Sequence, residues 1–122
     1  MTFSILGRCA ATGQFGMAVS SSSPAVAARC AHARAGVGAV ASQNVTDPRL
    51  GIHVLDAMAN GMDADAAIAS VIAAANHTDF RQLLAIDHAG RTAIFSGTNT
   101  LEINAEYQSQ NAAAAGNLLA NP

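Results

Sequence analysis

Residues 2–21, TFSILGRCAATGQFGMAVSS, contain two β-prone runs, Thr2–Arg8 and Gln14–Ser21, separated by a turn sequence. Gly13 lies in this turn, where tight hairpins favour glycine. The stretch therefore predicts an antiparallel hairpin at the start of the chain.

A second hairpin is expected further along the chain. Phe80–Asp87 and Arg91–Ser96 are again β-prone, and residues 88–90 form the turn between them. Leu101–Gln108 predicts one more strand. No element is assigned to the small-residue segment Asn111–Pro122.

Three segments follow the first hairpin. Ala25–Arg34 is short and Ala-rich and favours a helix. Ala35–Gln43 predicts a third strand, in which Gly36 and Gly38 lack side chains and so permit close packing. Asn44–Gly51 carries the densest polar cluster of the chain and is interpreted as a loop.

Two antiparallel helices are expected before the second hairpin. Ile52–Met58 starts the first helix, and the pair Asn60-Gly61 ends it. Asp63 or Asp65 can cap the second helix. Its apolar positions recur at helical spacing: Ala67, Ile68, Val71 and Ile72.

This order of elements, three strands, two helices and three strands, predicts an α+β or layered α/β fold with mainly antiparallel sheets. The 122 residues and their 51% apolar content suit one domain over residues 1–122. Aromatic residues make up only 4%, so a tight core of small side chains is expected.

The composition argues against several classes of partner. Charged residues make up 11%, against roughly 25% in ordinary soluble domains, which favours a homo-oligomer whose surface is partly covered. The net charge is −2, lysine is absent and the six arginines are scattered, so no nucleic-acid ligand is expected. No apolar stretch approaches the ~20 residues of a membrane span, and no leader pattern is visible, so no membrane partner and a cytoplasmic location are expected.

The cysteines and histidines do not indicate a cofactor. Cys9 and Cys30 are interpreted as reduced, small hydrophobic residues. The four histidines lack the spacing of metal ligands, and Gly36 and Gly38 lack the third glycine of a dinucleotide fingerprint. Neither a metal nor another cofactor is expected.

Three blocks carry a resemblance to a known family: GMAVSSSSPAVAARCAHARAGVGAVASQNVTDPRLG (residues 16–51), FRQLLAIDHAGRTAIFSG (80–97) and AAGNLLANP (114–122). Together with the opening TFSILGR, they resemble the bacterial domain-of-unknown-function family numbered 1028 over nearly the whole chain. That family is similar in fold to the N-terminal-nucleophile (Ntn) hydrolases. The resemblance implies a four-layer αββα sandwich, of which this chain is the N-terminal part.

The resemblance also implies a mechanism. A Thr, Ser or Cys at a free N-terminus attacks an amide carbonyl, and its own α-amine, with a pKa of ~8, is the general base. Thr2 is such a nucleophile only if Met1 is removed. Because family members continue beyond the GNLLANP segment, the other expectation is that autoproteolysis creates a second chain after Pro122 and that this chain starts with the nucleophile.

Candidate site residues come from the polar loop and the C-terminal segment. Asn44 is the candidate oxyanion donor. Arg49 can hold a carboxylate and Asp47 an amine of the substrate, with Gln43 and Thr46 lining the same site. Asn117 is expected to contribute because of its position near the expected cleavage point.

The resulting hypothesis is an amidohydrolase that cuts an amide or lactam bond in a small polar molecule. The scarcity of aromatic residues favours a small substrate. The alternative is a non-catalytic small-molecule-binding or assembly protein on the same fold, because a fold alone does not determine function.

Overall fold

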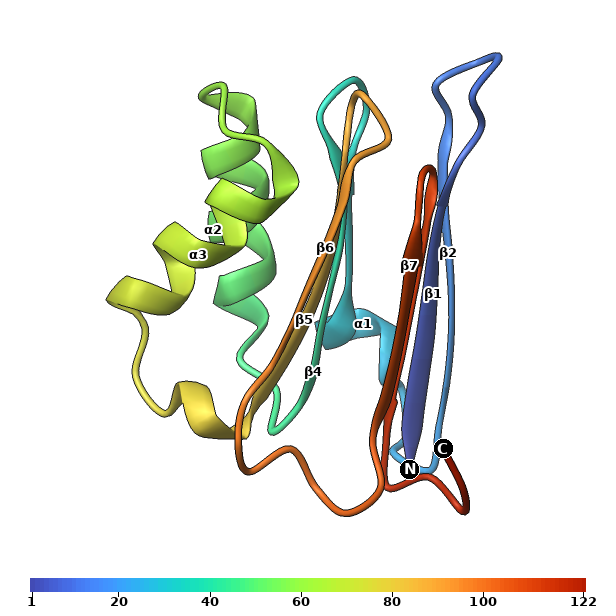
Figure 1. Ribbon diagram of the computed structural model, residues 1–122, viewed down its shortest axis with the longest axis vertical. Helices are drawn as coiled ribbons and strands as arrows, with labels where there is room; N and C mark the ends of the chain where they lie inside the picture. The colour runs from blue at the N-terminus through green and yellow to red at the C-terminus, as the bar shows by residue number, and fades with distance from the viewer.

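The computed structural model describes all residues from 1 to 122. Three layers lie side by side (Figure 1): a helical layer, a central sheet and an outer sheet. Each sheet has four antiparallel strands, so the fold is α+β. None of the helices combines the length and the apolar character required to cross a bilayer.

The outer sheet is built from the two ends of the chain. Its strand order is β2-β1-β8-β7, with bounds Thr2–Arg8 (β1), Phe15–Ser21 (β2), Ala105–Ser109 (β7) and Ala112–Asn117 (β8). The predicted first hairpin forms β1 and β2, and Gly13 in its turn has a φ of +74°. In this order, β1 and β8 are the two inner strands, and β1 pairs with β2 on one side and with β8 on the other.

The central sheet has the order β3-β4-β5-β6. Its strands are Ala31–Arg34 (β3), Gly38–Asn44 (β4), Arg81–Asp87 (β5) and Thr92–Ser96 (β6). The predicted second hairpin forms β5 and β6. Nearly every residue of β4 and β5 is buried, because one face of this sheet packs on helices and the other on the outer sheet.

The helical layer consists of α2 (Pro48–Ala59) and α3 (Ala64–Ala74). Asp47 is the N-cap of α2 and accepts a hydrogen bond from Arg49 N, with Pro48 in the first turn, where proline is favoured. Asp63, not Asp65, caps α3. Residues 48–51, interpreted as loop from the sequence, are thus the first turn of α2.

Two hydrophobic cores follow from the alternation of side chains in the central sheet. Val40, Leu83 and Ala85 face α2 and α3, whereas Leu84 and Ile86 face the outer sheet. The small side chains permit close packing. A Cβ atom on Gly38 would overlap the Ile86 carbonyl oxygen and lie 2.7 Å from Met58 Cε.

Three expected segments have different bounds. The helix expected over Ala25–Arg34 is the short α1 (Ala27–Cys30), followed by β3, which pairs with β4. The strand expected over Leu101–Gln108 is β7, displaced towards the C-terminus, and a short 3-10 helix, η1 (Thr78–Phe80), precedes β5. The unassigned Asn111–Pro122 contains β8, whose alanines become a strand by pairing with β1 and β7.

The outer sheet has one uncovered face. Phe3, Ile5 and Tyr107 are 48%, 50% and 67% exposed. With Leu119 and small residues of β7 and β8, Phe3, Ile5 and Tyr107 line an apolar groove of about 390 Å³. We call this surface the outer face.

Candidate functional site

A cluster of buried amides connects the two sheets. It consists of Gln43 from β4, Gln82 from β5, Asn117 from β8 and Ser4 from β1, each 2% exposed or less. We call these four residues the amide cluster. Gln43 and Gln82 lie on the face of the central sheet that packs against the outer sheet, where β1 and β8 supply the other two.

Hydrogen bonds of 2.5 to 3.1 Å link the members of the amide cluster. Ser4 Oγ donates to Gln43 Oε1 at 2.5 Å, and Gln43 Nε2 donates to Gln82 Oε1 at 2.7 Å and to the Ala115 carbonyl at 3.1 Å. Asn117 Nδ2 donates to the same Gln82 oxygen at 3.0 Å. Buried amides without partners would destabilise the fold, so this network holds the strands in one register.

Cys30 of α1 adjoins this cluster. Its Sγ lies 3.8 Å from Ser4 Oγ and 3.9 Å from Gln43 Oε1. Burial raises the pKa of the Cys30 thiol, which keeps the sulfur protonated. Since the thiolate is the reactive form, Cys30 is a packing and hydrogen-bonding residue.

Thr2 lies at the end of the amide cluster. It pairs with Ser21 on one side and with Asn117 on the other, and it shares the strand face of Ser4. The Thr2 and Ser21 hydroxyls share a hydrogen bond of 2.7 Å, and the Met1 α-amine donates to Ser22 Oγ at 3.1 Å. Hydroxyl groups therefore surround the start of β1.

Asn44 follows Gln43 in β4, but its side chain lies outside the amide cluster and bonds to the backbone of two other segments. Its φ of +75° is left-handed, a conformation that Asn tolerates better than most residues. Its Nδ2 donates to the Phe80 carbonyl at 2.7 Å, and its Oδ1 accepts from Leu101 N at 3.3 Å. One N–H of this amide is thus used by Phe80, and the second N–H is the one left for the oxyanion that the sequence predicted.

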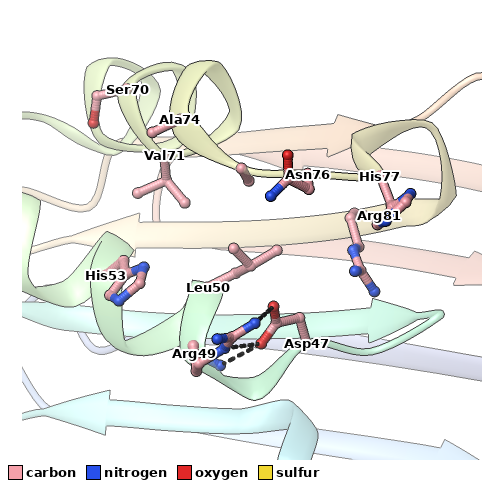
Figure 2. Close-up of a pocket in the computed structure, with 11 residues that line it drawn as sticks. Asp47, Arg49, Leu50, His53, Ser70, Val71, Ala74, Asn76, His77 and Arg81 are labelled. Carbon is pink, nitrogen blue, oxygen red and sulfur yellow. Dashed lines mark hydrogen bonds and ion pairs between the residues drawn. The ribbon is translucent and has the colours of Figure 1, made fainter.

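Asp47 and Arg49 lie in a cleft on the helical side of the central sheet (Figure 2). The Arg49 guanidinium donates to both Asp47 oxygens, from Nε at 3.0 Å and from Nη2 at 2.8 Å. These hydrogen bonds lower the pKa of Asp47 to about 2. Thr46 is half-buried beside them.

The predicted site residues therefore form two groups. Gln43 and Asn117 meet at the amide cluster next to Thr2, whereas Asp47 and Arg49 line the cleft. Sequence reasoning missed Ser4 and Gln82. A signal existed for Gln82, because it is a polar residue in the otherwise apolar run QLLAI of a buried strand.

The helical-side cleft also contains residues that the sequence did not single out. His53 comes from α2, His77 and Arg81 come from the segment around η1, and Asn76 lies between α3 and η1. These residues are distant in sequence from Asp47 and carry no recognisable spacing. No group of three or more His, Cys, Asp or Glu side chains is placed to hold a metal ion.

The chain belongs to a family of unknown function, DUF1028, whose model matches residues 2–122. No curated protein matches the chain. Among solved structures it is similar to the crystal structure of protein SPO2555 from Silicibacter pomeroyi, described as a member of DUF1028. The identity is 29% and the TM-score 0.94, over 98% of this chain and 56% of that chain. The chain thus spans little more than half the length of this relative.

Proposed function

We propose that this chain is part of an N-terminal-nucleophile hydrolase that cuts an amide or lactam bond in a small polar molecule. The observation that carries the proposal is the position of Thr2. Thr2 starts β1, an inner strand of the outer sheet, between Ser21 and Asn117, where the hydrogen bonds of the amide cluster tie β1 and β8 to the central sheet. Rigid support of a reacting group is what catalysis requires.

The reaction uses Thr2 after removal of Met1. The free α-amine accepts the hydroxyl proton while Oγ1 attacks the amide carbonyl, and the substrate amine then leaves with that proton. Water hydrolyses the resulting ester and restores the Thr2 hydroxyl. Gln43 and Asn117 act as positioning residues, because their side chains are buried and hydrogen-bonded within the cluster.

Asn44, Thr46, Asp47 and Arg49 are proposed to contact the substrate. The loop that carries them follows β4 and lies at the same end of the layers as the N-terminus (Figure 1). Asp47 and Arg49 also line the helical-side cleft, whose lining does not include Thr2. Asn44 is the proposed oxyanion donor through the second N–H of its amide, since the first is bonded to the Phe80 carbonyl.

We propose that a second polypeptide completes the fold as a four-layer αββα sandwich. The outer face is apolar and uncovered, and large exposed apolar patches mark interaction surfaces. The matched relative is longer than this chain, since the match covers 56% of its chain. The nucleophile that the sequence alternatively predicts would then be the first residue of this second chain.

Intact-mass spectrometry of the purified protein, before and after incubation with reactive acyl amides and lactams, tests the proposal. We expect loss of Met1, an acyl adduct on Thr2, and turnover of at least one small amide. Thr2→Val should abolish the adduct, whereas Thr2→Ser should retain it, because only valine lacks the hydroxyl.

Thr98→Val is the matched control, because Thr98 is an exposed threonine away from the outer sheet. An adduct on a companion polypeptide that starts with Thr, Ser or Cys would move the nucleophile to that chain. If Thr2 is free and no polypeptide forms an adduct, the chain is a binding or assembly protein.

A further inference from the structure

The helical-side cleft has a volume of about 670 Å³, within the usual range for small-molecule sites. It lies between the N-terminal half of α2, the C-terminal end of α3 and the start of β5. Figure 2 shows Arg81 and His77 on one side, His53 on another and Arg49 beside Asp47. Thr2 and the amide cluster are not part of its lining.

Arg81 makes no direct ion pair, although its charge helps to lower the pKa of Asp47. It takes part in none of the ion pairs of the chain, and its guanidinium contacts only the Val45 carbonyl, through Nη1. Its Nε is buried without a hydrogen-bond partner. A guanidinium has five N–H donors, so most of those on Arg81 remain unused.

Arg49 adds a second cation. Two of its guanidinium nitrogens, Nε and Nη2, bind Asp47, which leaves Nη1 free to contact a ligand. Because its side chain is 78% exposed, Arg49 can turn towards the cleft.

The charge of the cleft is opposite to that of the whole chain. Two arginines and one carboxylate, Asp47, give a net charge of +1 with the histidines neutral, whereas the chain carries −2. His53 and His77 are exposed and line the cleft, so their ring nitrogens are available to a ligand. Such a set of donors suits an oxyanion.

We propose that this cleft is a binding site for a small organic anion that carries a carboxylate or phosphate group. Arg81 binds the oxyanion as the main donor, Arg49 binds through its free nitrogen, and His53 and His77 donate further hydrogen bonds. Asp47 and Arg49 are also proposed contacts of the hydrolase substrate, but anion binding in this cleft needs no reaction at Thr2, so the site stands whether or not the chain cuts amides.

An NMR titration with sodium phosphate and, separately, sodium acetate tests the site, with sodium chloride holding the ionic strength constant. We expect saturable shifts at His53, His77 and Arg81, with a Kd of about 1 mM. Saturation by phosphate alone indicates a phosphate-bearing ligand. Saturation by acetate as well indicates a carboxylate.

Variants give the decisive readout. Arg81→Gln should weaken binding about tenfold or more, because it removes charge-assisted hydrogen bonds. Arg49→Gln should weaken binding less than Arg81→Gln does. Because the Arg49 side chain is exposed, Arg49→Gln should also leave the fold intact, so it tests the site even if Arg81→Gln unfolds the chain. Arg34→Gln is the matched control, since Arg34 is a partly exposed arginine paired with Asp56 outside the cleft.

Thr2→Val should bind the anion as the unchanged chain does, which separates this site from the hydrolase proposal. Two results would overturn the inference. One is a linear response to phosphate and acetate that chloride reproduces, and the other is equal affinity in the Arg49→Gln, Arg81→Gln and Arg34→Gln chains.

Discussion

At the scale of single residues, Asn44 combines a left-handed backbone with a side chain that is hydrogen-bonded through both its nitrogen and its oxygen. Its left-handed φ turns the chain out of β4, and its amide connects the Phe80 carbonyl with the backbone of Leu101. The loop that follows Asn44 carries Thr46, Asp47 and Arg49. The conformation of Asn44 therefore positions the proposed substrate contacts.

We predict that Asn44→Ala lowers the free energy of unfolding by about 2–3 kcal/mol, and Asn44→Gly by about 1 kcal/mol less than that. Both changes remove the two side-chain hydrogen bonds, but only alanine strains the left-handed backbone. Urea denaturation followed by circular dichroism measures both values.

Asn60 is the matched control for this pair. It ends α2 with a φ of −85°, a right-handed backbone in which alanine is not strained. There the glycine variant should be no more stable than the alanine variant. Equal losses for the two Asn44 variants would contradict the role assigned to its backbone.

At the scale of elements, Asp87 joins β5, the following turn and α3. Its carboxylate is 1% exposed and accepts hydrogen bonds from the backbone of Ala64, Ala89 and Arg91 and from the Arg91 side chain. Burial alone would raise its pKa, but the hydrogen bonds from Arg91, Ala64 and Ala89 outweigh burial and lower it.

We predict that Asp87→Asn destabilises the fold by about 2–4 kcal/mol at pH 7, because an amide nitrogen faces N–H donors in place of an oxygen. Since the folded-state pKa is lowered, the ionised form stabilises the fold above the unfolded-state value of about 3.9. This stabilisation is lost as the pH falls through the folded-state pKa.

Urea unfolding at pH 7 and at acidic pH measures this effect. The unchanged chain should lose stability on acidification, and the difference between it and Asp87→Asn should shrink. Asp65→Asn, at an exposed carboxylate in the first turn of α3 without a side-chain hydrogen bond, should change stability by less than about 0.5 kcal/mol. A pH-independent difference would argue against an ionised Asp87.

At the scale of the whole molecule, the layers are unevenly covered. The central sheet is covered on both faces, whereas the outer sheet presents Phe3, Ile5 and Tyr107 to solvent. The chain also has few charged residues, so electrostatic repulsion between two copies of it is weak. An uncovered apolar face of this kind favours association.

We predict that the isolated 122-residue chain self-associates through the outer face and that Ile5→Lys weakens this association at least tenfold. A buried lysine would lose its hydration in the contact. Sedimentation velocity over a range of concentrations measures the effect.

Ile52→Lys is the matched control, because Ile52 is 47% exposed on α2, close to the 50% of Ile5, but lies on the opposite layer. It should leave the association unchanged. A monomer at all concentrations, or equal effects of the two lysines, would argue against the outer face as an association surface.

The local pattern of the sequence determined the elements whose periodicity is strong. The hairpins β1–β2 and β5–β6 and the helix α3 were predicted because glycine turns, β-prone runs and helical spacing act between near neighbours. The α+β class follows from the order of these elements. The loop Asn44–Gly51 was identified as polar, although its second half is the first turn of α2.

Only the tertiary structure decided the elements and contacts that depend on distant partners. The alanines of β8 have a low local preference for a strand and extend because β1 and β7 bind both their edges. In the same way, stacking of the two sheets brings together Gln43, Gln82 and Asn117. Packing of α2 beside β5 places Arg49 and Arg81 in one cleft. Local sequence cannot specify such contacts, since they arise from burial and hydrogen bonding between segments far apart in the chain.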